Sequence, residues 1–307
     1  MKIYVLSEIP DLIFSKEQKK QLAKGGRVVY INKAKPLSEL KELLKDEEEK
    51  VLAIDPDFWV WNAPNELTKA VKNIKAICLQ STSFSWLDVG VAKKNGVPVV
   101  NLRGFPTVAV AEWATMMTLA VARKIPLIAQ NAWKMNYDTQ RGLELRGRTA
   151  GIVGLGEIGT AIAENMKGLG LHLQYWSNQS RDKRFKKVPL AQLMKTSDVI
   201  LLTLAKNVET KKLITDSMLK SMKKDAMFIS VVHEIYNHDL LLDMAAKNKI
   251  YGYAFEEQKG KFLIYKGNVW GGPEMAWYTE ESVRKNAEQW TEGILAATKG
   301  KFPNKVN

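Results

Sequence analysis

The sequence predicts an α/β protein with two parallel sheets, each covered by helices on both faces. Short apolar runs alternate with charged stretches that suit helices, and they do so in two successive series along the chain. A glycine-rich turn stands between an apolar run and a helical stretch at the start of the second series. The length of 307 residues and the hydrophobic share of 46% suit two packed domains and exclude a disordered or fibrous class.

The first series begins at the N-terminus and contains strand-like runs rich in valine, isoleucine and leucine. Each run is followed by a more polar stretch, as expected for buried strands joined by surface helices. The runs lie at residues 3–6, 28–31, 51–54, 76–79 and 97–100. We therefore predict a first parallel sheet from the first hundred residues.

A long segment of apolar and small residues at 106–130 separates the two series, and its helical spacing predicts a connecting helix. The second series predicts a second parallel sheet. Its apolar runs lie at residues 151–153, 171–176, 199–202, 227–231 and 250–254. A last helical stretch at 280–299 follows, and we expect it to return to the first unit.

The glycine-rich turn predicts a dinucleotide site. Its three glycines have separate tasks: Gly154 allows the backbone angles of the turn, Gly156 lets the main chain approach a pyrophosphate, and Gly159 lets the next helix pack on the strand. That helix starts at Glu157 and Ile158, so its first free N–H groups and the positive end of its dipole would face the phosphates. A bare glycine pattern also occurs in ordinary turns, but its place between a strand and a helix favours nucleotide binding.

The end of the second strand of this unit predicts which dinucleotide is bound. No carboxylate stands there to bond the ribose hydroxyls of NAD. Ser177, Asn178, Ser180 and Arg181 instead supply hydrogen-bond donors and positive charge, which a ribose 2′-phosphate requires. We therefore predict a preference for NADP, with NAD possible if the segment is a polar loop with incidental charge.

The composition excludes several other classes. The formal charge of +13 is spread over helical faces that also carry glutamates, and no nucleic-acid-binding motif accompanies it. The longest apolar stretch, 108–122, is interrupted by Glu112 and is too short for a membrane span, and the N-terminus lacks the layout of a signal peptide. We expect a cytoplasmic protein that binds no nucleic acid and no membrane.

Cysteine and histidine usage argues against several chemistries. Cys78 is the single cysteine and lies in an apolar run, so we expect a core residue and no disulfide within the chain. The three histidines have no metal-binding spacing, and no G-x-S-x-G elbow of a hydrolase occurs. We predict no metal site.

Four segments resemble the D-isomer-specific 2-hydroxyacid dehydrogenase family. They are Leu-Arg-Gly-Arg-Thr at 145–149 before the glycine turn, Val-Ala-Val-Ala-Glu-Trp-Ala at 108–114, and the segments 93–101 and 209–214. The resemblance covers about residues 70 to 290, and the first 70 residues fit only in pattern.

The resemblance implies the arrangement of the domains. It implies a flavodoxin-like substrate domain from residues 1–102 and 283–307, and an inserted Rossmann cofactor domain from residues 103–282. It also implies a cleft between them and a homodimer joined by the helix after Glu112. The family reduces 2-keto acids or oxidises 2-hydroxy acids.

The family uses an arginine, a histidine and a glutamate, and this chain departs from the pattern at all three positions. The arginine grips the substrate, the histidine delivers a proton, and the glutamate holds the histidine in its acid form. Here His233 stands at the arginine position, Glu274 at the histidine position, and Lys261 nearest to the glutamate position.

The substrate loop departs from the family pattern as well. A glycine-rich segment normally offers backbone N–H groups to the substrate carboxylate, whereas this chain has Ser81, Thr82 and Ser83, followed by bulkier residues. Trp277 falls near positions that line the cleft in relatives, as do three other tryptophans, at 86, 113 and 270. They suggest either a large apolar ligand or ordinary core and interface packing.

Two functions remain open from the sequence. In the first, the protein is an active NAD(P)-dependent reductase in which His233 and Glu274 form the proton-transfer pair with exchanged positions, and Lys261 supplies a fixed positive charge. Its substrate would be a 2-keto or 2-hydroxy acid or a related carbonyl compound. In the second, the protein binds the nucleotide without turnover, as a sensor or an assembly partner. Loss of all three family residues favours the second, while the complete glycine turn is required by both.

Overall fold

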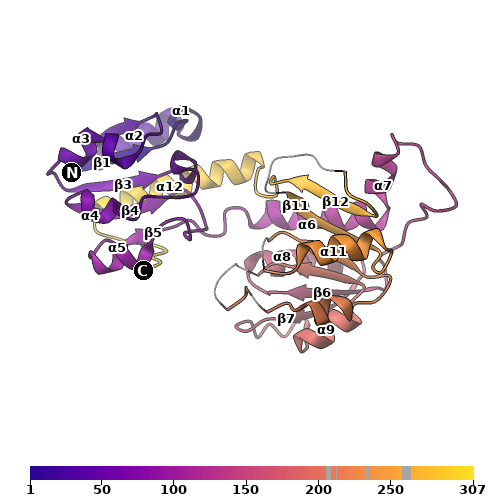
Figure 1. Cartoon of the computed structure of the whole chain (residues 1–307). Helices are drawn as coiled ribbons and strands as arrows, with labels where there is room; N and C mark the ends of the chain where they lie inside the picture. Colours follow the sequence, from indigo (N-terminus) through magenta and orange to yellow (C-terminus); the bar gives the residue numbers. More distant parts are fainter. Residues whose placement is uncertain (205–208, 212, 233–234, 258–263) are drawn as a thin grey trace. The chain divides into compact units, whose positions relative to one another are not determined.

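The computed structural model describes residues 1–204, 209–211, 213–232, 235–257 and 264–307. The chain divides into two compact units (Figure 1). Unit 1 consists of Met1–Phe105 and Glu280–Asn307, and unit 2 of Pro106–Thr279. Each unit is built on a parallel sheet of its own, so the predicted fold class, two doubly wound parallel-sheet domains, is confirmed.

Unit 1 contains a five-stranded parallel sheet in the order β2-β1-β3-β4-β5, the order of flavodoxin-like folds. Its strands are β1 (Lys2–Leu6), β2 (Arg27–Ile31), β3 (Lys50–Ile54), β4 (Ile74–Leu79) and β5 (Val99–Val100). Its helices are α1 (Pro10–Ile13), α2 (Lys16–Gly25), α3 (Lys41–Lys45), α4 (Leu67–Ala70), α5 (Val89–Lys94) and α12 (Glu280–Thr298), with short 3-10 turns η1 (Leu37–Glu39) and η2 (Pro56–Trp59).

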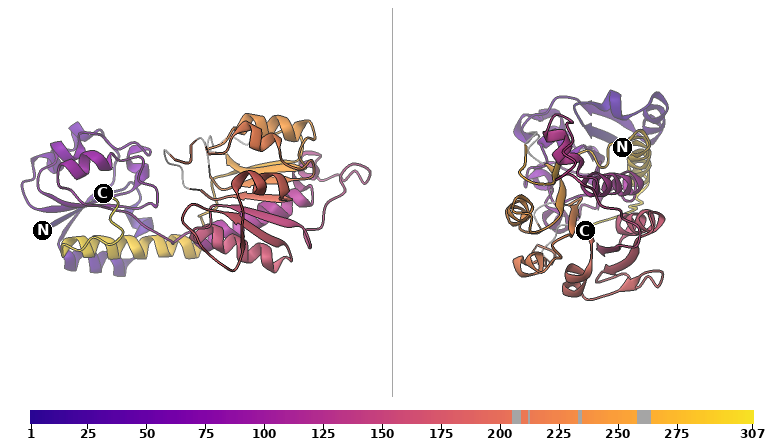
Figure 2. Two further views of the ribbon diagram at one scale, coloured as in Figure 1. Left: turned by 90° about the horizontal axis from the view of Figure 1, so that it is seen from below. Right: turned by 90° about the vertical axis from the view of Figure 1, so that its right-hand side faces the viewer.

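Helix α12 returns to unit 1 and lies along one face of its sheet, beside α2 (Figure 2). Trp290 is fully buried there, stacks on Phe14 with a centroid distance of 5.0 Å, and donates its indole N–H to the Cys78 carbonyl. The last helix therefore completes the core on this face of the first sheet. Cys78 is the buried core residue that the sequence predicts.

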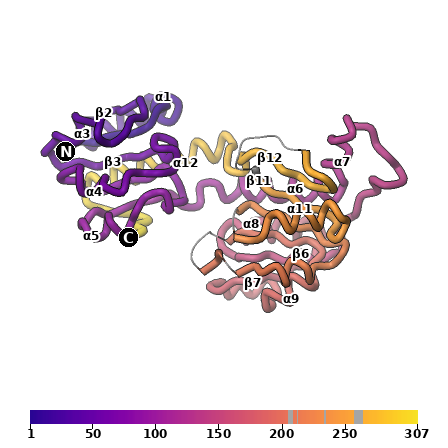
Figure 3. Tube along the Cα trace, in the orientation of Figure 1, coloured from indigo at the N-terminus to yellow at the C-terminus, as the bar shows by residue number. Residues whose placement is uncertain are grey.

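Unit 2 contains a seven-stranded parallel sheet in the order β12-β11-β10-β9-β6-β7-β8. Its strands are β6 (Thr149–Val153), β7 (His172–Trp176), β8 (Lys186–Lys187), β9 (Val199–Leu202), β10 (Met227–Ser230), β11 (Gly252–Glu257) and β12 (Val269–Pro273). Its helices are α6 (Thr107–Ala122), α7 (Ile125–Gln130), α8 (Glu157–Gly168), α9 (Leu190–Thr196), α10 (Asp216–Lys220) and α11 (His238–Ala246). Between α7 and β6 the chain makes a long excursion from the body of this unit (Figure 3).

The structure corrects the prediction in three places. The single helix predicted over 106–130 is two helices, because the chain turns at Lys124, which is left-handed with φ 56°, and Pro126 opens the next helix. Strand β8 was not predicted from the sequence, because its two residues are too few to show the periodicity of a strand. Strand β12 contains two glycines and a proline, which are unfavourable in a strand, but it lies at an edge of the sheet where proline is tolerated.

No helix within the described ranges combines the length and the apolar character needed to cross a bilayer. The same described ranges contain no cluster of three or more histidine, cysteine or carboxylate side chains that could hold a metal ion.

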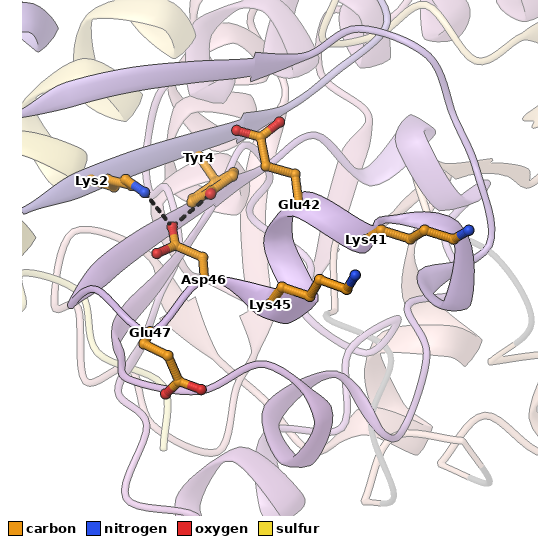
Figure 4. Close-up of a pocket in the computed structure, with 7 residues that line it drawn as sticks. All are labelled: Lys2, Tyr4, Lys41, Glu42, Lys45, Asp46 and Glu47. Carbon is orange, nitrogen blue, oxygen red and sulfur yellow. Dashed lines mark hydrogen bonds and ion pairs between the residues drawn. The ribbon is translucent and has the colours of Figure 1, made fainter.

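A charged hollow of about 490 Å³ lies on unit 1, and three of the residues that line it, Lys2, Tyr4 and Asp46, bond one another (Figure 4). At its centre the Asp46 carboxylate accepts hydrogen bonds from the Tyr4 hydroxyl (2.6 Å) and from Lys2 Nζ (3.0 Å). Behind it Lys50 is fully buried and donates to the carbonyls of Asp46 and Lys72 at 2.8 and 2.7 Å. These bonds tie the first residues of β1 and β3 to the segment that follows α3.

This cluster predicts an acid-sensitive contribution to stability. Burial alone would raise the pKa of Asp46, but hydrogen bonds from Tyr4, from the Glu48 backbone and from Lys2 outweigh it and hold the pKa at about 2. Because the folded pKa lies below the unfolded value, the stabilisation is present near neutral pH and is lost as the pH falls from about 5 towards 2. We expect Asp46→Asn to lower the free energy of unfolding by about 1 to 3 kcal/mol at pH 7 and to flatten its decline in acid. Urea unfolding from pH 7 to pH 3 measures both.

The matched control is Glu48→Gln, because Glu48 also pairs with Lys2 but is exposed. Its effect should stay below about 0.5 kcal/mol. Parallel loss of stability in acid by the wild type and Asp46→Asn would show that another carboxylate governs the acid response.

Candidate active site

The carboxyl ends of three neighbouring strands of unit 2 meet at the glycine turn. Strand β6 lies between β9 and β7, at the point where the strand order reverses, which is where parallel α/β sheets bind ligands. The N–H of Gly154 donates to the Trp176 carbonyl at the end of β7 (2.9 Å), and the N–H of Thr203 donates to the Val153 carbonyl (3.0 Å). The segments that follow β7, β6 and β9 are therefore neighbours at one edge.

The turn itself is packed on one side and open on the other. Gly154 has φ +99°, which favours glycine, and Thr203 Oγ1 donates to its carbonyl at 2.6 Å. A Cβ at Gly159 would lie 2.0 Å from that same carbonyl oxygen, so only glycine lets α8 approach the turn this closely. Gly156 is exposed, and a Cβ there would have no other described residue within 4 Å apart from its chain neighbours. The open side is a space into which a ligand can come against bare backbone.

The N-terminus of α8 faces this open side. Gly156 is its N-cap, and no side chain from the described part of the chain caps its first amides. The Glu157 carboxylate is exposed and lies near the Thr107 hydroxyl of α6, at 3.5 Å, while Ile158 is half-buried. The free amides and the dipole of this helix of 12 residues favour an anion at the turn.

The loop after β7 gathers positive charge. The Arg181 guanidinium is exposed and donates to the carbonyls of Asn178, Gln179 and Ser180. Lys187 of β8 donates to the Ser180 carbonyl as well, at 3.2 Å. Desolvation, and after it the charge of Arg181, lowers the pKa of Lys187, as expected for two cations held close together.

Ser177 and the one carboxylate of this loop, Asp182, form hydrogen bonds within the loop. Ser177 follows β7 directly, and its Oγ accepts from the Ser180 N–H at 3.1 Å. The Asp182 carboxylate bonds Arg184 at 2.6 Å, and that hydrogen bond lowers its pKa. The loop thus presents an excess of positive charge beside the glycine turn.

A buried carboxylate organises the far end of the same edge. Glu256, near the end of β11, accepts the backbone N–H groups of Met275 and Ala276, both at 2.8 Å. This bond holds the segment after β12, in which Glu274 is exposed and Trp277 is 42% exposed against Tyr278. The remaining two candidates for catalysis, His233 and Lys261, lie outside the described residues.

The candidate substrate loop lies in unit 1, after β4. Ser81 is buried and its hydroxyl donates to the Ser83 carbonyl at 2.6 Å, while Asn101 donates to the Thr82 carbonyl. Residues 82–85 are exposed. Among the described residues, none accepts a hydrogen bond from the backbone N–H groups of residues 82–85. Consecutive free amides of this kind can bind a carboxylate.

The four tryptophans that the sequence analysis names differ in how exposed they are. Trp86 is buried in unit 1, and Trp113 and Trp270 pack against the core of unit 2. Of the four that the sequence singles out, Trp277 is the exposed one. Packing therefore accounts for the other three.

Comparison with known proteins gives matches that include the glycine turn and the loop after β7. The family model "D-isomer specific 2-hydroxyacid dehydrogenase, NAD binding domain" matches residues 115–261. A glyoxylate reductase of Korarchaeum cryptofilum is 26% identical over 332 residues, covering 100% of this chain and 96% of that protein. A glyoxylate reductase of Thermococcus litoralis is 29% identical over 302 residues, covering 92% of this chain and 87% of that protein. Residues 115–261 match this dehydrogenase family, and the similarity to whole relatives supports the same family for the rest of the chain.

Solved structures share the fold of this chain. The solved structure of an acyclic imino acid reductase in complex with NADPH and D-Arg superposes with a TM-score of 0.86 at 23% identity, and each chain is covered over 100% of its length. The family resemblance predicted from the sequence is thus confirmed, and so is the class of activity, an NAD(P)-dependent hydroxyacid oxidoreductase. A nicotinamide dinucleotide is the cofactor of this dehydrogenase family.

Three further residues contact the candidate site and were not predicted from the sequence. Thr203 locks the glycine turn from β9, Lys187 joins Arg181 from β8, and Glu256 holds the segment that carries Glu274. Each could have been suspected as a polar residue next to an apolar run or a charged loop. Their partners, however, are distant in sequence, so only the fold identifies what they bind.

Proposed function

We propose that this protein reduces a 2-keto acid to the 2-hydroxy acid with NADPH. The open side of the glycine turn carries the proposal, because Gly156 and the uncapped amides of α8 leave room and donors for a pyrophosphate. When bound, the reduced nicotinamide supplies a hydride to the carbonyl carbon. The protein must supply a proton to the carbonyl oxygen and a hold on the carboxylate.

Preference for NADPH is supported by the loop after β7. Arg181 and Lys187 converge on the Ser180 carbonyl, and the Asp182 carboxylate is bound to Arg184. Arg181 and Lys187 can form charge-assisted hydrogen bonds with a 2′-phosphate, whereas NAD has no phosphate at that position for them to bind. Ser177 and Asn178 add donors on the same segment.

For the hold on the carboxylate we propose the free amides of the loop that begins at Ser81, Thr82 and Ser83, with Trp277 beside the substrate. For the proton we propose Glu274 and His233 as a pair, with Lys261 as a fixed positive charge. Glu256 supports this role by fixing the backbone next to Glu274. A carboxylate neighbour favours the charged form of a histidine, which is then a proton donor near neutral pH.

The proposed function is tested by following the absorbance of NADPH with glyoxylate, pyruvate and bulkier 2-keto acids. We expect His233→Ala and Glu274→Gln each to lower kcat by about 100-fold or more, the usual worth of a general acid, with the dissociation constant of NADPH unchanged. His172→Ala is the control, because His172 begins β7 at the opposite end of the sheet. Undiminished turnover in both variants would remove the pair from the mechanism. No turnover of any substrate, with tight binding of NADPH, would show a nucleotide-binding protein without catalysis.

We also propose that the protein is a homodimer. The excursion between α7 and β6 carries Trp133, Met135 and Tyr137, which are all exposed. Exposed aromatic side chains gathered on one segment are typical of an interface. Light scattering should give about twice the chain mass of 34.6 kDa.

A further inference from the structure

An apolar rim lies along the carboxyl edge of the sheet of unit 1. We use this term for Ile9 and Leu12, which follow β1, Val60 and Trp61, which follow β3, and Phe84, which follows β4. All five side chains are exposed, with Val60 at 83% and Trp61 at 49%. Because β1, β3 and β4 are neighbouring parallel strands, the segments after them lie at one edge. Exposed apolar groups gathered in this way mark a binding surface.

The backbone at the rim is held in an unfavourable conformation. Val60 and Trp61 are both left-handed, with φ 48° and 58°, although neither is glycine and valine is β-branched. The turn is kept by the Trp61 N–H, which donates to the Pro56 carbonyl, and by the Trp61 indole, which donates to Asp57 Oδ1 at 2.8 Å. Strain of this kind persists where the surrounding structure enforces it, and it often accompanies function.

Trp61 is connected to the free amides of the substrate loop. Its ring meets that of Trp86 edge to face, with a centroid distance of 6.2 Å and an angle of 73°. The Trp86 indole donates to Ser81 Oγ and to the Ser83 carbonyl, and its own carbonyl accepts the Ala63 N–H. Ring contacts and hydrogen bonds through Trp86 therefore connect Trp61 to the loop that carries the free amides.

We infer that Trp61 determines substrate specificity and that the substrate is a 2-keto acid with a bulky apolar side chain. The carboxylate binds the amides of residues 82–85, and the side chain covers the rim at Trp61. Burial of apolar surface against an indole favours a large side chain over none, whereas glyoxylate has nothing to place there. This inference rests on the proposed function and adds its substrate class.

The experiment compares phenylpyruvate with glyoxylate in the NADPH assay, using the whole protein and the variants Trp61→Ala, Trp61→Phe and Tyr30→Ala. We expect the wild type to prefer phenylpyruvate in kcat/KM by about 10-fold or more, within the range that a hydrophobic contact provides. In Trp61→Ala, kcat/KM for phenylpyruvate should fall while kcat/KM for glyoxylate stays the same, so most of the preference is lost. Trp61→Phe should keep part of the preference. Tyr30 is an exposed aromatic residue of β2 that contacts Lys19, so Tyr30→Ala serves as control.

A second readout separates this inference from the proposed function. Calorimetry with phenyllactate and glycolate on the protein saturated with NADPH measures selection without turnover, because hydroxy acid and reduced cofactor cannot react with each other, and thermal melting confirms that each variant is folded. Phenyllactate binding that weakens in Trp61→Ala supports the inference even if reduction is absent. Turnover with equal or better use of glyoxylate overturns the inference and leaves the proposed function standing. If NADPH binds but no keto acid or hydroxy acid is used or bound, both are wrong.

Discussion

Gly156→Ala is expected to abolish most nucleotide binding while leaving the protein as stable as before. Gly156 has extended backbone angles that alanine adopts freely, and a Cβ there would have no heavy atom of the described residues within 4 Å beyond its chain neighbours. The methyl group would instead occupy the space through which a pyrophosphate reaches the amides of α8. Loss of that approach should raise the dissociation constant of NADPH by about 100-fold, which corresponds to about 3 kcal/mol. Calorimetry gives the affinity and thermal melting gives the stability.

Gly159→Ala should damage both properties, and the contrast makes the test specific. A Cβ at Gly159 lies 2.0 Å from the Gly154 carbonyl oxygen, so α8 must move away from the turn. Such overpacking against backbone should cost about 1 to 3 kcal/mol in stability as well as the affinity for NADPH. The control is Gly168→Ala at the end of the same helix, where a Cβ also meets nothing and alanine is a better helix former.

Equal binding of NADPH by wild type and Gly156→Ala would mean that the pyrophosphate does not lie at this turn. The proposed site would then be wrong even with the family assignment in place, because that assignment depends on the match of the whole segment.

The double variant Arg181→Ala, Lys187→Ala is expected to show the second largest effect. Both cations bond the Ser180 carbonyl, so they lie close enough to share one phosphate. Each charge-assisted hydrogen bond to a phosphate is worth about 1.5 to 3 kcal/mol, so the pair should lower NADPH affinity by about 100-fold or more. NADH lacks the phosphate, and its affinity should change by less than about threefold.

Lys183→Ala is the matched control, because Lys183 is an exposed cation of the same loop. Measurements at low and moderate salt separate a specific contact from the general attraction of a chain with a net charge of +13. Equal losses for NADPH and NADH would show that the loop supports the fold of the site, and tighter binding of NADH by the wild type would overturn the preference for NADP.

The strands of both sheets could be predicted because their signal is local. Runs such as 51–54 and 199–202 are apolar at every position, as strands buried on both faces must be, and they became β3 and β9. Strand β12 gave no such signal, because Gly271 and Gly272 stand where side chains leave no room for a Cβ: at Gly272 it would lie 2.6 Å from the Trp270 indole nitrogen. The break at Lys124 was also hidden, since helical spacing continues on both sides of it.

The candidate site also has parts that the local sequence predicts and parts that depend on the fold. The glycine turn was readable because each glycine answers a local demand of the backbone, and its residues lie within one turn and one helix. The contacts of Glu256 and Trp61 were not readable. Glu256 accepts from residues about 20 positions further along, and Trp61 meets Trp86 across two loops.

By itself, then, the sequence determined the two parallel sheets, the glycine turn between strand and helix, and the family resemblance, because these depend on periodicity and on residue types at short spacing. The tertiary structure decided which cations share the Ser180 carbonyl, which carboxylate fixes the segment of Glu274, and which tryptophan is left exposed beside the free amides. The physical reason is that hydrogen bonds and burial join groups that neighbouring strands bring together, and chain order does not encode those distances.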